Sequence, residues 1–472
     1  MSAFLLLGLG MAIVLGGVIW LKLHPFLALA LAAFAVAFAT PGAALLSYAE
    51  NHTASQVALG KMDAAGAGVF KEGFAKMSPP KRVVDEFGKG CAKVGLIIAF
   101  AAMIGKFLLE SGAAAKIVMV MLSVFGERRA ALAFLASGFL LAIPVFFDTV
   151  FYLLVPLAVA MAHRTGGNYL LYCLCIVAGG TMAHSLVPPT PGPLFVAEEL
   201  EVSLAAMMAG GIAVGLFTVA FGFFYARWSA RRFDLAPPPL SDEVSLDSAD
   251  LPPAVVSFLP VVLPVALVTA GTLYSIFKPE GWAFLKVLGD KNVALGLSAA
   301  VAYLIFARAC RGDRDRMRSA SSDALASGAV IVLITAAGAA FGGVLKHTDI
   351  AAAIGGIGGS ATWALPVCFV ITTLVRTAQG SATVAMITAA PVAAAFAGAG
   401  ELGYHPVYLA LAVGCGSKPI PWMNDSGFWV ITKMTGMEEA QTLRTVTPMM
   451  SLMGLFGLVV VMLGSWILPF AA

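Results

Sequence analysis

The sequence predicts an all-α polytopic membrane protein made of two inverted repeats, and three observations support this fold class. The 472 residues are 60% hydrophobic and only 12% charged, which is more apolar than a soluble domain can bury. Apolar runs long enough to cross a bilayer follow one another along the whole chain. Proline and glycine residues recur in the two halves at one spacing, which indicates an internal duplication.

Each long apolar run is predicted to form a membrane span of about 20 residues. Polar residues dominate 48–90 and 234–253, so these stretches are predicted to be connectors, and 312–322 is predicted to be a short surface helix or loop. The predicted spans lie near residues 3–20, 23–40, 92–110, 169–187, 204–226, 254–275, 292–309, 323–345, 407–431 and 447–469.

Two further apolar regions are interrupted in the middle and are predicted to be re-entrant helical hairpins. The first, about 130–161, is broken at Pro144 and Asp148, and the second, about 362–399, is broken at Gln379-Gly380-Ser381. Each half of such a region is shorter than the roughly 20 residues that a span needs.

The two halves share the order helix, hairpin, broken helix, helix. Pro156 and Pro391 are separated by the same number of residues as Gly179 and Gly414. The predicted organisation is a first repeat over 1–233 with its broken helix at about 169–194, a cytoplasmic linker over 234–253, and a second repeat over 254–472 with its broken helix at about 407–431.

Basic residues flank only one of the two hairpins. Arg128, Arg129 and Arg164 border the first hairpin, whereas no basic residue borders the second at 358–360 or 400–402. Since cytoplasmic loops are enriched in Lys and Arg, the hairpins are predicted to enter the membrane from opposite sides. Each repeat then holds five spans and one hairpin, with both termini outside.

The stretch 414–427 holds two prolines, three glycines, Lys418 and Asp425 where a spanning helix is expected. Lipid cannot satisfy a broken backbone, so the break must face protein or a water-filled site. Charges at that depth are costly and usually functional. Inverted repeats with hairpins and broken helices are the architecture of secondary transporters, which bind solute where the repeats meet.

The predicted solute site favours an anion. Half-helix N-termini present free N–H groups, Arg376 offers a planar fork for a carboxylate, and Lys418 adds a point charge. Arg376 equally fits a structural partner for Asp425 or Asp148. The candidate substrate-binding residues are Thr149, Thr181, Ser185, Thr190, Arg376, Gly380, Ser381, Thr383, Lys418, Asn424, Asp425 and Ser426.

Three residues are candidates for carrying a coupling proton: Asp148, Asp425 and His184. Asp148 lies at the midpoint of the first hairpin, and we expect it to carry the proton. Asp425 precedes a restarting helix, where a carboxylate caps free N–H groups, so we expect it mainly to organise the second broken helix. A lone helix histidine such as His184 is more often a packing residue, although it can titrate near neutral pH.

Neither an enzyme nor a cofactor is expected. The chain has no H-E-x-x-H motif and no nucleophile motif of an intramembrane serine protease, and its six cysteines form no C-x-x-C pair. We therefore expect no metal and no disulfide framework. A channel would need an open pore lined by charges or carbonyls, and the paired hairpins favour alternating access instead.

Three segments resemble the gluconate permease family of proton symporters, and the likeness covers most of the chain. They are Pro188-Pro189-Thr190-Pro191-Gly192-Pro193, Gly380-Ser381-Ala382-Thr383-Val384-Ala385 and Asn424-Asp425-Ser426-Gly427-Phe428-Trp429. The chain departs from the family pattern at Thr190, where members have His, at Ser426, where they have Pro, and at Phe147-Asp148-Thr149, where they tend to have Tyr-Glu-Val.

The resemblance implies proton-coupled uptake of gluconate or a related hydroxylated monocarboxylate across the bacterial inner membrane. It also implies a homodimer in which a hairpin-bearing body moves against a fixed scaffold, here expected at residues 3–40 and 204–309. The departures leave the substrate open to a shorter sugar acid, a hydroxy acid or D-serine, and coupling to sodium is the alternative to coupling to protons.

Overall fold

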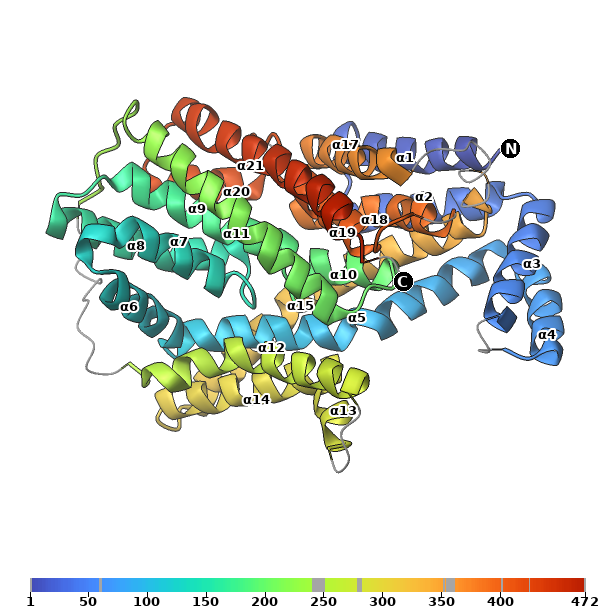
Figure 1. The fold of residues 1–472 in the computed structure, drawn as a ribbon, viewed down its shortest axis with the longest axis horizontal. Coiled ribbons are helices and arrows are strands. Elements are labelled where there is room, and N and C mark those ends of the chain that lie inside the picture. The colour runs from blue at the N-terminus through green and yellow to red at the C-terminus, as the bar shows by residue number, and fades with distance from the viewer. Residues whose placement is uncertain are drawn as a thin grey trace.

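The chain is helical almost throughout in the computed structural model, which describes residues 2–58, 62–239, 251–277, 282–350, 353, 361–399, 402–423 and 425–470 (Figure 1). The described part of the chain contains no β-strand. The first half holds α1 (Ala3–Ile19), α2 (Pro25–Ala39), α3 (Gly42–Ala58), α4 (Ala64–Ala75), α5 (Pro79–Glu110), α6 (Ala113–Phe125), the short 3-10 helix η1 (Glu127–Arg129), α7 (Ala130–Leu141), α8 (Phe147–Thr165), α9 (Tyr169–Leu186), α10 (Pro191–Glu199) and α11 (Leu204–Ser229). The second half holds α12 (Ala254–Phe277), α13 (Phe284–Leu288), α14 (Lys291–Ala309), α15 (Arg314–Lys346), α17 (Ala361–Gln379), α18 (Ala382–Gly398), α19 (Val407–Gly416), α20 (Ser426–Thr435) and α21 (Glu439–Ile467).

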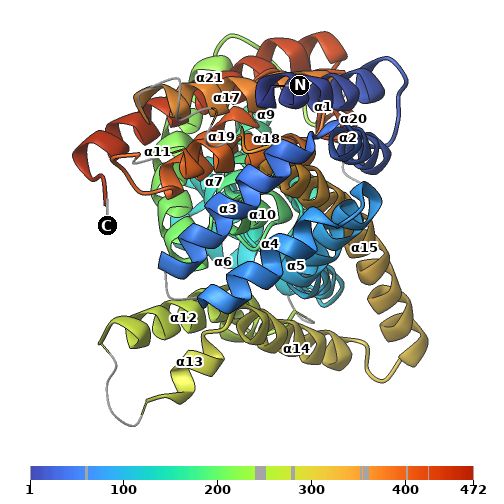
Figure 2. The same ribbon diagram turned by 90° about the vertical axis from the view of Figure 1, so that its right-hand side faces the viewer.

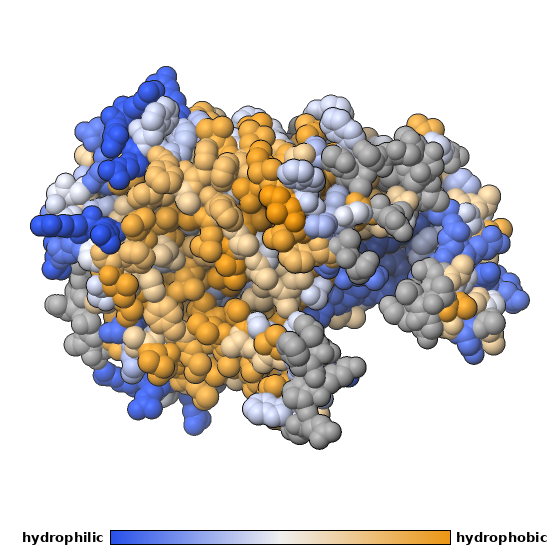
Figure 3. All heavy atoms as spheres, in the orientation of Figure 1, coloured by the Kyte–Doolittle hydropathy of each residue, from blue (hydrophilic) through white to orange (hydrophobic). Residues whose placement is uncertain are grey.

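The described helices confirm a multi-pass membrane protein. Eight of them are long and apolar enough to cross a bilayer, and α2 with α3 forms a ninth candidate that is bent by 100°. Figure 3 shows a broad hydrophobic band over the middle of the molecule, between hydrophilic ends. Such a band is the surface that a membrane-spanning protein presents to lipid.

Residues 48–90, predicted to be a connector, contribute to α3, α4 and the first turns of α5. Residues 312–322, predicted to be a short surface helix or loop, include the first turns of α15, which begins at Arg314. The helices within 48–90 were missed because hydropathy reports apolar content, whereas helix formation depends on backbone hydrogen bonding and on one packed face. The polar start of α5 has such a face, on which Arg82 and Val83 are buried.

The regions predicted to be hairpins form two contacting helix pairs, α7 with α8 and α17 with α18. The first pair breaks over 142–146 around Pro144, and the second over Gly380 and Ser381. Gly380 has a φ of 82°, which an L residue rarely adopts, and the Ser381 side chain caps α18 by accepting from the Val384 N–H at 3.4 Å. Helix α7 has only 12 residues, whereas α8 has 19 and is long enough to span alone.

Both predicted broken helices are interrupted. The first runs through α9 and resumes as α10 with Pro191 at its first position, where the missing N–H costs nothing. The second ends as α19 at Gly416 and resumes as α20 at Ser426. The Asp425 side chain caps α20 by accepting from the Gly427 N–H at 2.8 Å, which is the capping expected of this residue.

The helices form two groups that meet along α15 and α18. Helices α1, α2, α5, α12, α14 and α15 pack on one another, and the hairpins pack on the broken helices (Figures 1 and 2). Helix α11 lies against α9, α19 and α21, and contacts α12 less extensively. The small residues of α11, such as Gly211 and Gly222, pack closely on neighbouring helices, and the expectation that residues 204–229 belong to a fixed scaffold stays a prediction.

Candidate functional site

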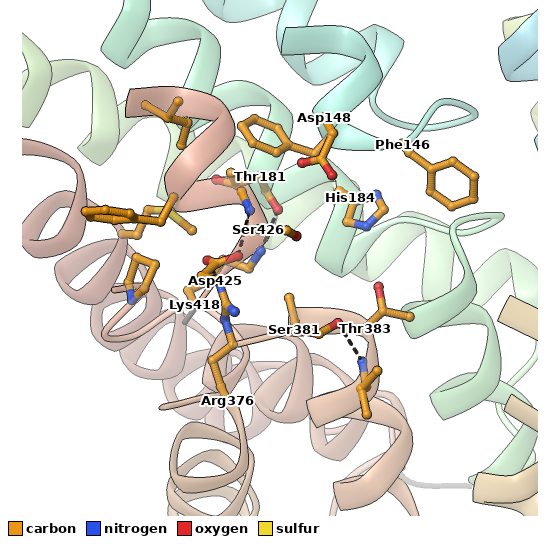
Figure 4. Close-up of a pocket in the computed structure, with 18 of the residues that line it drawn as sticks. Phe146, Asp148, Thr181, His184, Arg376, Ser381, Thr383, Lys418, Asp425 and Ser426 are labelled. Carbon is orange, nitrogen blue, oxygen red and sulfur yellow. Dashed lines mark hydrogen bonds and ion pairs between the residues drawn. The ribbon is translucent and has the colours of Figure 1, made fainter. Parts of the chain in front are cut away.

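A cavity of about 380 Å³ lies where the two hairpin breaks meet the second broken helix (Figure 4). Its wall comes from both halves of the chain. The lining residues are Phe146, Phe147, Asp148, Thr149, Thr181, His184, Ser327, Ile331, Ile334, Arg376, Ser381, Ala382, Thr383, Val384, Ile387, Lys418, Pro421, Asp425, Ser426, Gly427, Phe428, Ile431, Val446 and Met450.

Three helices begin at this cavity. The first residues of α8, of α18 and of α20 all line it. The first N–H groups of a helix have no partner within the helix, and the helix dipole places partial positive charge there. Such helix ends favour a negatively charged group nearby, as the Asp425 carboxylate at the start of α20 already illustrates.

Arg376 lies at the wall of the cavity, and its side chain is 3% exposed. Its Nε donates to the Ser417 carbonyl at 3.1 Å, one terminal nitrogen donates to the Gly380 carbonyl, and the other pairs with the Asp425 carboxylate. The guanidinium thus ties the tip of the second hairpin to both ends of the second break. The structural partnership with Asp425, one of the two roles considered for Arg376, is present.

Lys418 is the second buried cation of the cavity, with 2% of its side chain exposed. Its Nζ donates to the Thr181 carbonyl of α9 at 2.8 Å, which links the two broken helices. An ammonium has three donors, so this contact leaves two for other partners. Among the described residues Lys418 makes no ion pair.

Asp148 and Asp425 differ in their bonding. Both Asp425 oxygens are used, one by the Gly427 N–H and the other by Arg376. The Asp148 side chain points into the cavity (Figure 4), and no described residue donates a hydrogen bond to it. It lies beside the start of α20, since a side-chain carbon added to Gly427 would lie 3.8 Å from the Asp148 Oδ1.

The structure brings most of the predicted site residues together. Those that line the cavity are Asp148, Thr149, Thr181, His184, Arg376, Ser381, Thr383, Lys418, Asp425 and Ser426. Gly380 does not line the cavity, but its carbonyl accepts a hydrogen bond from Arg376. Ser185 lies at the contact of α9 with α19, and Thr190 donates to the Val187 carbonyl at 2.7 Å, so neither lines the cavity. Asn424 lies outside the described residues.

Sequence reasoning missed two walls of the cavity. Ser327, Ile331 and Ile334 of α15 close one side, and Val446 and Met450 of α21 close another. These side chains carry no signal in the sequence, because apolar and hydroxyl residues in a spanning helix look alike whether they face lipid or a cavity. Only the packing of the helices in the structure shows that these side chains face the cavity.

A comparison with protein-family models shows which family the chain belongs to. The model described as GntP family permease matches residues 57–467, which is most of the chain. The chain belongs to the GntP family of permeases. The motif resemblance is confirmed, and the match identifies the chain as a permease.

Curated relatives agree with this assignment. The chain is 30% identical to the "Gluconate permease" of Pseudomonas aeruginosa and to the "Low-affinity gluconate transporter" of Escherichia coli K12, over 84% of this chain and 90% of each relative. It is 28% identical to the "Gnt-II system L-idonate transporter" of Escherichia coli K12, over 82% of this chain and 89% of that relative.

A solved structure shares the fold. The YdaH transporter of Alcanivorax borkumensis, whose structure is described as having an unusual topology, superposes with a TM-score of 0.61. The similarity covers 87% of this chain and 91% of that one at 16% sequence identity, so it concerns the fold alone.

Proposed function

We propose that this permease imports gluconate or a related hydroxylated monocarboxylate across the bacterial inner membrane together with a proton. The observation that carries the proposal is the convergence of three helix N-termini and two cations on one cavity. The relatives named for gluconate and L-idonate add the chemical class, since both substrates are polyhydroxylated monocarboxylates.

The substrate carboxylate is held by Lys418 and the helix N-termini. Arg376 already donates to three protein acceptors and is neutralised by Asp425, so it acts as a positioning residue that fixes the hairpin tip. Lys418 has no carboxylate partner among the described residues. A buried charge is costly unless it is paired, and an anionic substrate supplies the missing pair.

Free hydroxyls on the cavity wall suit a polyol chain. Thr149, Thr383 and Ser426 line the cavity from three different helices, and none has a hydrogen-bond partner among the described residues. A site built to hydrogen-bond a substrate hydroxyl rejects analogues that lack it. These three residues therefore select a hydroxylated acid over a simple fatty or keto acid.

Charge balance couples the proton to the substrate. The described lining residues include two cations, Arg376 and Lys418, and two carboxylates, Asp425 and Asp148. With neutral His184 and ionised Asp148 the cavity carries no net charge, and protonation of Asp148 gives it one positive charge. A monocarboxylate then restores neutrality, so each favours binding of the other.

The two hairpins and the broken helices are proposed to move as one body, in an elevator-like exchange between two inverted repeats and within a homodimer. The division of the helices into two packed groups supports this motion. Thr149 also lines a second cavity, of about 420 Å³, together with Glu110 and Arg316. Because Thr149 lines both cavities, the second one supports a route from the site toward the end of the molecule that carries Arg316.

Substrate class is tested by counterflow in proteoliposomes preloaded with single compounds. Gluconate and L-idonate should each drive uptake of labelled gluconate, whereas short hydroxy acids should drive it weakly. Exchange with D-serine alone, or with none of these compounds, would refute the proposed substrate. Replacing the pH gradient by a sodium gradient separates the two coupling ions.

Two variants separate binding from positioning. Lys418→Met removes the free cation and should raise the KM of exchange at least tenfold, the equivalent of about 1.4 kcal/mol. Arg376→Lys keeps the charge but loses the planar fork, so it should lower the maximal rate and leave KM within about threefold. A large rise in KM for Arg376→Lys with none for Lys418→Met would show that Arg376, and not Lys418, binds the substrate carboxylate.

A further inference from the structure

A groove rimmed by arginines opens on the surface between η1, α7, α9 and α11. It has a volume of about 460 Å³, and its floor is formed by Ala131, Leu132, Leu171 and Phe223. Arg128, Arg129 and Arg227 stand at its rim. Its lining thus combines an apolar floor with a cationic edge, and it is separate from the cavity described above.

The three rim arginines carry uncompensated charge. All three side chains are exposed, and none has an acidic partner among the described residues. The nearby Glu127 is occupied by Arg164 at 2.7 Å. Three like charges gathered around one groove repel one another unless an anion lies between them, so the rim is complementary to a group such as phosphate.

The groove lies at the depth of the membrane–water interface. Trp228 follows Arg227 on α11, is 44% exposed, and has the Arg232 guanidinium 4.3 Å above its ring. Exposed Trp residues of membrane proteins concentrate at this level. Farther along α11, Leu216 and Phe217 are more than half exposed and form part of the lipid-facing surface. The hydrophilic end of the molecule meets the hydrophobic band in this region (Figure 3).

We propose that this groove binds an anionic phospholipid of the cytoplasmic leaflet. The phosphate lies among the three guanidinium groups, and an acyl chain lies along Leu132, Leu171 and Phe223. Basic pockets between membrane helices on the cytoplasmic side are suited to anionic headgroups. Because η1 leads directly into the first hairpin and α11 packs on the first broken helix, the lipid would bridge two elements that support the transport site.

The test uses the purified full-length chain in detergent, with phosphatidylglycerol or phosphatidylcholine added. Native mass spectrometry should show retention of phosphatidylglycerol in preference to phosphatidylcholine. The triple variant Arg128→Gln, Arg129→Gln, Arg227→Gln should lose roughly a hundredfold in apparent affinity, at about 1 kcal/mol for each basic residue. The control Arg308→Gln, Arg314→Gln, Arg318→Gln removes the same charge at the same end and should retain the lipid.

Three outcomes would overturn the proposal. They are equal retention of both lipids by the unaltered chain, equal loss in both triple variants, and saturation by free glycerol phosphate in place of the lipid. If the groove variant does not fold, the single changes Arg129→Gln and Arg227→Gln should each weaken retention about fivefold. No effect of either would likewise contradict the assignment.

Discussion

At the scale of residues, the site separates the charges that hold the protein from those left for ligands. Arg376 and Asp425 satisfy each other and the broken backbone around them. Lys418 keeps two donors, and Asp148 receives no donor from the described residues. We therefore expect the first pair to organise the site, and the second pair to bind the substrate and couple the proton.

Asp148→Asn should abolish accumulation driven by a pH gradient while leaving exchange at equal concentrations. The amide keeps the size of the side chain but cannot take up a proton, so the cavity stays in its anion-binding state. The measurement is uptake by proteoliposomes, with counterflow in the same preparation as control. Continued pH-driven accumulation would move the coupling role to His184 or Asp425.

Some of the residue chemistry was predictable and some was not. Capping by Asp425 follows from its place before a restarting helix, because free N–H groups there need an acceptor. The three acceptors of Arg376 were not predictable, since two of them are backbone carbonyls exposed only by the folded breaks. An intramembrane arginine shows in the sequence, but its partners depend on tertiary contacts.

At the scale of elements, two neighbouring ion pairs join the end of α10 to the other helix group. Glu199 of α10 accepts from Lys346 of α15 at 2.6 Å, and Glu198 pairs with Lys291 of α14. These pairs fasten the first broken helix to α14 and α15. If the two groups move past each other, both pairs must break.

Removing these pairs with Lys291→Gln and Lys346→Gln should speed counterflow by roughly twofold to thirtyfold, because partly exposed pairs contribute about 0.2–1 kcal/mol each. The readout is the initial exchange rate, with thermal stability measured alongside. Lys433→Gln, which breaks an exposed pair with Glu439 outside this contact, is the matched control. An exchange rate equal to that of the control would show that the pairs do not hold a transport state.

Breaks were predicted better than helix lengths. Pro144 and Gly380 interrupt the backbone by their own geometry, so the hairpin tips are visible in the sequence. Helices α3 and α4 and the start of α5 were missed because their polar residues hide the helical pattern from hydropathy. The packing of α11 on α9, α19 and α21 was not predictable, since a spanning helix does not reveal its packing partners.

At the scale of the whole molecule, the termini lie away from the end that carries α6, η1 and the α8–α9 connection (Figure 1). We expect the ends of the two hairpins to face opposite sides of the membrane. Ser123→Cys, beside the first hairpin, should label only from the cytoplasm, and Leu402→Cys, beside the second, only from outside. Labelling of both from one side would contradict inverted repeats.

One native cysteine must be removed before these labelling experiments, because it could react with the label itself. Five of the six cysteines are buried, and only Cys91 is partly exposed, so the variants are made with Cys91→Ser. A parent protein without added cysteines gives the baseline.

The central claim is that this chain is a proton-coupled carrier for a hydroxylated monocarboxylate. Its most direct test is the uptake of labelled gluconate by proteoliposomes with an acidic exterior, no sodium and no membrane potential. We expect accumulation above the external concentration, which should be lost when a protonophore collapses the gradient. Entry that only equilibrates, with the same time course at every imposed pH difference, would contradict it.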